Sequence, residues 1–236
     1  MSDFGLSVAQ IAALDTPILT ALRTSHAALA LNARFVSRYP AAIAPFAALI
    51  EEGAQAHNEL RDFAKLGPVA LLYPDAGAPA PVAGLDVKIA AKVMQMIATI
   101  PAAAPPGFTP ETLGVADVPD MLELTALTKP GPFFARTPEL GRYIGIRIDG
   151  RLAAMAGERM RPQGFTEISA VCVHPDFQGR GHAKALVKAL MGSIAARSER
   201  PFLHLYADNP GARALYERLG FVPRQIFEFR VMAAPA

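Results

Sequence analysis

The loop at residues 178–183 joins an apolar segment, residues 165–173, to a segment with apolar residues at intervals of three and four, which predicts a helix. Gly179 and Gly181 adopt positive φ angles at no steric cost, so the backbone can turn sharply and approach a ligand closely. Amides at the start of the helix can then converge on an anion. The loop is therefore interpreted either as a phosphate-binding site or as an ordinary strand-to-helix turn.

Helix and strand signals alternate through the second half of the chain. Residues 117–128 begin with an acid and an early proline and continue with helical apolar spacing, which predicts a helix. Asp149 and Gly150 separate two apolar segments and predict a tight hairpin leading into the strand at 165–173. After the helix that follows the glycine loop, the pattern predicts a strand at 202–206, a helix from Asn209 and a final strand.

The first half carries weaker signals. Helical spacing occurs over residues 8–24 and 55–66, and apolar segments predict strands at 69–73 and 93–97. Residues 101–107 contain three prolines and no periodicity, which is typical of a linker. We therefore predict a boundary near residue 105, with an N-terminal α/β region over 1–105 and a second domain over 106–236.

Composition restricts the partners. The net charge is +2 with no run of like charges, so nucleic acid and membrane surfaces are not expected as partners. The arginines are interpreted as solvated surface charges; those near the hairpin and the long helix are Arg159, Arg161, Arg197 and Arg200. No paired metal ligands occur, so no metal is expected.

The single cysteine, Cys172, excludes an internal disulfide and is compatible with a reducing cytosol. Its place in an apolar strand favours a buried structural thiol over a nucleophile. The first residues lack the basic and apolar regions of a signal peptide, so we expect a cytoplasmic protein. The oligomeric state is left open.

Three motifs in one order resemble the GCN5-related N-acetyltransferase (GNAT) superfamily. Residues 178–183 satisfy its acyl-CoA signature Gln/Arg-x-x-Gly-x-Gly/Ala, the preceding strand ends in residues 171–176, and residues 209–221 resemble Asn-x-x-Ala-x-x-Leu-Tyr-x-x-x-Gly-Phe. Residues 133–160 look most like the FR47-like branch. The resemblance implies an α/β (α+β) fold with a mixed, mostly antiparallel sheet flanked by helices, and it allows 1–105 to be a degenerate second copy.

The resemblance also implies acetyl-CoA as co-substrate. The glycine-loop amides would bind its diphosphate, and the end of the strand would pair with pantetheine and polarise the thioester carbonyl. Gln178 would close the loop or bond a phosphate, Arg180 would pair a phosphate or face solvent, and Asn209 would cap a helix or reach the cofactor. The expected cofactor-binding residues are Val171, Cys172, Val173, Gln178, Gly179, Arg180, Gly181, His182, Ala183 and Asn209.

Acetyl transfer requires a neutral amine, and an amine of pKa near 10.4 is almost fully protonated at pH 7, so a base is useful. By resemblance Glu167 is the first candidate; His204 and Glu158 follow, and each has a structural interpretation as well. With a period of two, Glu167, Ser169, Val171 and Val173 are expected on one strand face.

Tyr216 occupies the superfamily position whose phenol protonates the departing CoA thiolate, although helical spacing also suits a core aromatic. The implied function is N-acetyl transfer to a primary amine by direct attack, without an acyl-enzyme. The alternative is a catalytically silent acyl-CoA-binding or regulatory module. The acceptor is a small-molecule or peptide amine that the sequence does not identify.

Overall fold

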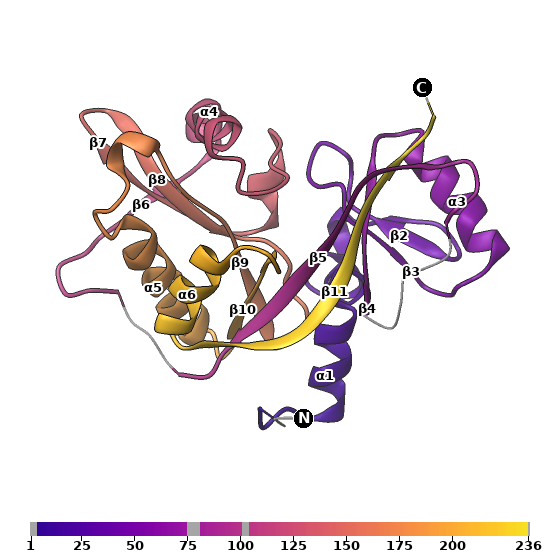
Figure 1. Ribbon diagram of the computed structural model, residues 1–236, viewed down its shortest axis with the longest axis horizontal. Helices are drawn as coiled ribbons and strands as arrows, with labels where there is room; N and C mark the ends of the chain where they lie inside the picture. Colours follow the sequence, from indigo (N-terminus) through magenta and orange to yellow (C-terminus); the bar gives the residue numbers. More distant parts are fainter. Residues whose placement is uncertain (1–3, 75–80, 101–103, 236) are drawn as a thin grey trace.

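The computed structural model describes residues 4–74, 81–100 and 104–235. An eight-stranded sheet forms its centre, in the order β4-β11-β5-β10-β9-β8-β7-β6 (Figure 1). Only the β9 and β10 neighbours run parallel, so the predicted mixed, mostly antiparallel sheet is confirmed. The strands are β4 (Val69–Pro74), β5 (Asp86–Ala98), β6 (Glu111–Leu113), β7 (Tyr143–Ile148), β8 (Arg151–Glu158), β9 (Phe165–Val173), β10 (Arg200–Tyr206) and β11 (Phe221–Ala233).

Helices cover both faces of the sheet between β6 and β10, with α5 (His182–Ala195) and α6 (Pro210–Arg218) on one face and α4 (Val118–Thr128) on the other (Figure 1). Helix α5 buries Leu186, Leu190 and Ile194, which its periodicity predicts as its core face. Helix α4 buries Met121 and Leu124 against β8 and β9. Short 3₁₀ turns connect these elements: η2 (Val115–Asp117), η3 (Thr137–Leu140) and η4 (Pro175–Phe177).

The first half also contains helices α1 (Val8–Asp15), α2 (Pro17–Arg23) and α3 (Ala54–Ala64), the turn η1 (Ala27–Leu29), and a small sheet of β1 (Leu31–Asn32), β2 (Val36–Arg38) and β3 (Ala47–Leu49). The predicted helix over 8–24 is divided in two, because Pro17 lacks an N–H and begins a new helix. Among the helices of the described residues, none is both long and apolar enough to cross a membrane.

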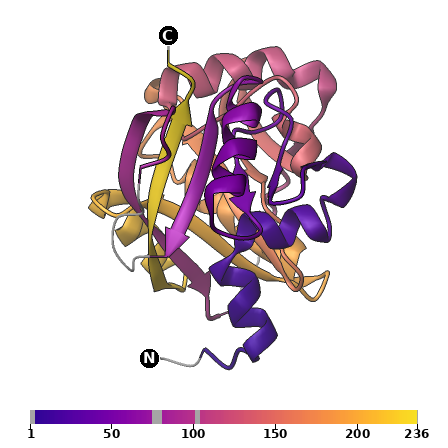
Figure 2. The same ribbon diagram turned by 90° about the vertical axis from the view of Figure 1, so that its right-hand side faces the viewer.

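The large sheet is continuous across the predicted boundary near residue 105. Strand β5, from the first half, lies between β10 and β11 from the second, and β4 pairs with the outer edge of β11 (Figure 2). Side chains of both halves share one core, in which Leu14 and Phe46 pack with Phe202. The division into domains stays a prediction, and residues 101–103 of the predicted linker lie outside the described residues.

Strands β9 and β10 pair only at their beginnings. Their ladder runs from the pair Phe165 and Arg200 to the pair Glu167 and Phe202. Beyond it, residues 168–173 of β9 pair with β8 but not with β10, while β10 pairs with β5. The two strands therefore diverge and leave facing edges open to a ligand.

A bulge at Ala170 changes which residues of β9 share a face. Ala170 has φ +50°, and the β8 register shifts beside it. Ile168 and Val171 consequently both pack on the α5 side, whereas Cys172 packs on the α4 side. The expected common face of Glu167, Ser169, Val171 and Val173 is wrong, because alternation across Ile168 places Glu167 opposite Val171.

Candidate active site

A cavity of about 370 Å³ opens where β9 and β10 diverge. It reaches both faces of the sheet, from Tyr216 of α6 on one side to Phe46 of the first half on the other. Its lining residues are Phe46, Leu72, Val93, Thr128, Lys129, Pro130, Gly131, Pro132, Arg159, Met160, Ile168, Ser169, Ala170, Val171, Cys172, Val173, Gln178, His204, Leu205, Tyr206, Asn209, Ala212, Tyr216 and Phe229.

The glycine loop begins at this cavity, because Gln178 lines it, whereas residues 179–183, which lead into α5, are not among its lining residues. Gly179 and Gly181 have φ angles of +76° and +80°, and a Cβ at either would meet nothing within 4 Å. Backbone conformation, not crowding, therefore requires glycine here. No side chain caps α5 at Gly181, and the first-turn amides of a helix have no intrahelical partner, so this end presents free N–H donors to an anion.

Side chains of the glycine loop stabilise its conformation through hydrogen bonds to nearby backbone carbonyls. The Gln178 amide donates to the Val173 carbonyl at 3.4 Å, and Arg180 donates to the Asp176 carbonyl while its guanidinium lies over the Phe177 ring. His182 Nε2, in the first turn of α5, is buried without a hydrogen-bond partner among the described residues.

Asn209 accepts a hydrogen bond from the Ala212 amide at 2.9 Å, so its predicted capping role is confirmed, and it also lines the cavity.

Glu167 is fully buried, and its carboxylate is saturated with hydrogen bonds. Arg159 donates Nε and Nη2 to its two oxygens at 2.8 and 2.6 Å, His204 Nδ1 lies 2.7 Å from Oε1, and the Met160 amide donates at 3.3 Å. Burial by itself would raise the pKa of Glu167, but the charge of Arg159 and the hydrogen bonds from Arg159 and His204 hold this pKa well below its ordinary range. Glu167 is not among the cavity-lining residues.

His204 connects Glu167 to the first half of the chain. Gln95 Nε2 lies 3.2 Å from His204 Nε2 and donates to the Leu14 carbonyl, while Gln95 Oε1 accepts from Arg224. With its NH₂ group oriented in this way, Gln95 donates to Nε2. In this arrangement Nε2 of His204 accepts a hydrogen bond, and Nδ1 donates one to Glu167.

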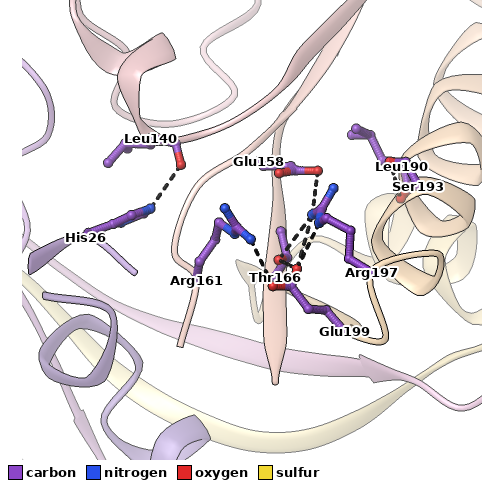
Figure 3. A network of polar contacts seen from close by, with 9 residues as sticks. All are labelled: His26, Leu140, Glu158, Arg161, Thr166, Leu190, Ser193, Arg197 and Glu199. Carbon is purple, nitrogen blue, oxygen red and sulfur yellow. Dashed lines mark hydrogen bonds and ion pairs between the residues drawn. The ribbon is translucent and has the colours of Figure 1, made fainter. Parts of the chain in front are cut away.

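Glu158, the third candidate base, is not among the residues that line the cavity. It is 2% exposed and accepts a hydrogen bond from Arg197 at 2.9 Å (Figure 3). The neighbouring Arg161 donates to Glu199 in the same polar cluster. These contacts give Glu158 a structural role.

Tyr216 and Cys172 both line the cavity. Burial raises the pKa of Tyr216 to about 12, so its phenol keeps its proton at neutral pH. Burial also raises the pKa of the Cys172 thiol to about 11, in agreement with a buried structural thiol.

The expectation that Arg159 is a solvated surface charge is wrong. Its side chain is only 13% exposed, because it pairs with Glu167 and lies over the Phe46 ring. The sequence does contain a signal for this pair. The turn at 162–164 reverses the chain, so Arg159 before it and Glu167 after it come next to each other with opposite charges. Arg197 and Arg200 are likewise held, the latter by the Ala98 and Phe4 carbonyls.

Comparisons with known proteins show the family of this chain. The FR47-like protein family matches residues 143–229. A solved GNAT-family protein from Novosphingobium aromaticivorans is 37% identical, with a TM-score of 0.84 and coverage of 94% of this chain and 99% of that one.

Two curated relatives match over shorter segments. The N-alpha-acetyltransferase RimI of Mycobacterium tuberculosis is 35% identical over 82 residues, which cover 34% of this chain and 51% of RimI. The mycothiol acetyltransferase of Beutenbergia cavernae is 37% identical over 76 residues, 32% of this chain and 26% of that protein. The match thus spans about half or less of these two relatives, whereas the Novosphingobium protein matches along its whole length. The chain belongs to the GCN5-related N-acetyltransferase (GNAT) family.

Proposed function

We propose that this protein is an N-acetyltransferase that moves the acetyl group of acetyl-CoA to a primary amine by direct attack. The observation that carries the proposal is the cavity between the diverging ends of β9 and β10, together with the glycine loop that leads from it to the uncapped start of α5. One arrangement thus offers an open strand edge and a group of amide donors. Family membership supports acetyl-CoA as the ligand that requires both.

In this proposal the amides of residues 179–183 bind the diphosphate of acetyl-CoA, aided by the helix dipole. The pantetheine amides pair with the open edge of β9 at residues 171–173, in the manner of an added strand. A backbone N–H there polarises the thioester carbonyl and stabilises the negative charge that develops on its oxygen. The diphosphate and thioester thus bind at different parts of the site.

We assign the base to His204 and give Glu167 a positioning role. Glu167 has four hydrogen bonds and does not line the cavity, whereas His204 does. Since Nδ1 donates to Glu167, Nε2 carries the lone pair, and an incoming amine or water replaces the 3.2 Å contact with Gln95. The carboxylate then stabilises the imidazolium, as in hydrolase triads.

Changing His204→Asn is expected to lower kcat by about 10²-fold, since the Asn amide can donate to Glu167 but cannot accept the amine proton. Steady-state kinetics with a primary amine as acceptor would measure this loss. A variant with unchanged kcat would assign the base elsewhere.

For the acceptor, we propose a primary amine on a small molecule or a peptide. RimI is named as an N-alpha-acetyltransferase and the Beutenbergia protein as a mycothiol acetyltransferase, so the relatives include both kinds. The alternative of a silent acyl-CoA-binding module predicts acetyl-CoA binding by calorimetry without thiol release on any amine of a broad panel.

The glycine loop gives a matched test of acetyl-CoA binding. Gly181→Ala and Gly150→Ala both place a Cβ at φ near +80°, with open space around it, and so share a strain of about 1–2 kcal/mol. Only Gly181 lies at the start of α5, where the proposed diphosphate site is. Calorimetry should therefore show acetyl-CoA binding weakened about tenfold in Gly181→Ala and unchanged in Gly150→Ala. Equal affinities for the two variants would refute the proposed diphosphate site.

A further inference from the structure

The cavity has an end that the proposed position of acetyl-CoA leaves free. On the face away from α5 and α6, its wall is formed by Phe46, Leu72 and Val93 of the first half together with Phe229. Arg159 lies among these apolar side chains, with its guanidinium carbon 4.8 Å from the centre of the Phe46 ring. The acceptor amine must approach the thioester from this end.

Arg159 is held on one side and open on the other. Glu167 accepts hydrogen bonds from Nε and Nη2, so the salt bridge fixes the plane of the guanidinium. Nη1 has no hydrogen-bond partner among the described residues, although the side chain is 87% removed from solvent. A guanidinium fixed in this way has two further N–H donors for an anion and need not move to use them.

The charges around the cavity have one sign. Its lining includes Arg159 and Lys129, and no aspartate or glutamate among the described residues. The carboxylate of Glu167, which pairs with Arg159, does not line the cavity and is saturated by its own partners. A polycationic amine therefore finds no carboxylate on these walls, whereas an acceptor carboxylate finds a positively charged donor in a partly desolvated place, where the interaction is strong.

We propose that the acceptor is an amine that carries a carboxylate on an apolar or aromatic body. Nη1 of Arg159 binds the carboxylate, while Phe46, Leu72 and Phe229 contact the body. This inference rests on the proposed transferase function. In the reaction the amine nitrogen bonds to the acetyl carbon as the carbon–sulfur bond breaks, and the proton lost from nitrogen ends on the CoA sulfur.

The test compares phenylalanine with phenylalaninamide as acceptors. The two compounds have the same side chain and the same primary amino group. The amino group of phenylalaninamide is less basic, so more of it is neutral at pH 7, and on this ground alone the amide should react faster. A preference for phenylalanine must therefore come from recognition of the carboxylate. We expect kcat/KM for phenylalanine to exceed that for the amide about 10- to 100-fold, the value of a charge-assisted hydrogen bond.

Two matched variants assign the preference to Arg159. Arg159→Lys keeps a positive charge beside Glu167 but removes the guanidinium fork, and it should abolish the preference. Arg161→Lys makes the same substitution two residues away, in an arginine that pairs with Glu199 and does not line the cavity, and it should retain the preference. Retention of the preference in Arg159→Lys would overturn the assignment.

The wild-type enzyme decides the question even if Arg159→Lys does not fold. Equal or faster acetylation of phenylalaninamide, or acetylation of spermidine but not phenylalanine, would overturn the inference and leave the transferase proposal standing. Acetyl-CoA binding without acetylation of any of the three amines would overturn this inference, and only the same result across the broad amine panel would count against the transferase proposal.

Discussion

Changing Tyr216→Phe is expected to lower the rate of acetyl transfer by about 10²- to 10³-fold with little change in the affinity for acetyl-CoA. We propose that the phenol donates a hydrogen bond to the sulfur as negative charge develops there; the phenol is protonated across the working pH range because burial raises the pKa of Tyr216 to about 12. The ring of the variant fills the same space beside Phe221, so the packing of α6 is preserved. Only an interaction made in the transition state is lost.

Single-turnover measurement of thiol release is the suitable assay, since slow product release would hide a change in the chemical step. Tyr73→Phe is the control: burial also raises the pKa of Tyr73 to about 12, but this tyrosine does not line the cavity. A Tyr216→Phe enzyme with the wild-type single-turnover rate would remove Tyr216 from the mechanism.

Changing Glu167→Gln is expected to destabilise the fold by about 3–5 kcal/mol at pH 7, because it leaves the Arg159 charge buried without its partner. Urea unfolding at pH 7 measures this loss. Glu217→Gln is the control, since Glu217 pairs with Arg213 on the exposed face of α6, where an ion pair contributes little. A loss for Glu167→Gln no larger than that for the control would show that the buried pair is unimportant for stability.

The pH dependence of stability has a defined sign. The pKa of Glu167 is lower in the folded protein than its ordinary value of 4.5, so its contribution is fully present above that pH and is lost as the pH falls below it. The difference in the free energy of unfolding between the wild type and Glu167→Gln should therefore become smaller below pH 4.5. If this difference in the free energy of unfolding stays constant from pH 7 to pH 3, the ionised Glu167 carboxylate does not contribute the stability that we expect.

The local signals in the second half of the sequence predict its longer helices and strands, although not the short strand β6. Helix α5 has apolar residues on one strict face, and the hairpin has Asp149 and Gly150, both of which adopt positive φ. These features act within a few residues, so they can be interpreted without knowing the tertiary structure.

Long-range features could not be predicted in the same way. No local pattern indicates that β5 inserts between β10 and β11, because strand order depends on partners far away in sequence. The bulge at Ala170 likewise reverses the expected alternation of β9 through one residue with positive φ. For the same reason, sequence position alone made Glu167 the first candidate base, whereas the structure shows how Arg159 and His204 hold it.

The insertion of β5 between β10 and β11 has a consequence for how the chain acquires its structure. Both neighbours of β5 lie more than 100 residues later, at Arg200–Tyr206 and Phe221–Ala233, so β5 leaves the ribosome long before either partner exists. Such non-local pairing slows folding and prolongs the exposure of strand edges. Gln95, which contacts His204, lies on this strand. We therefore expect the candidate active site to be completed late, when the C-terminal strand pairs with β5.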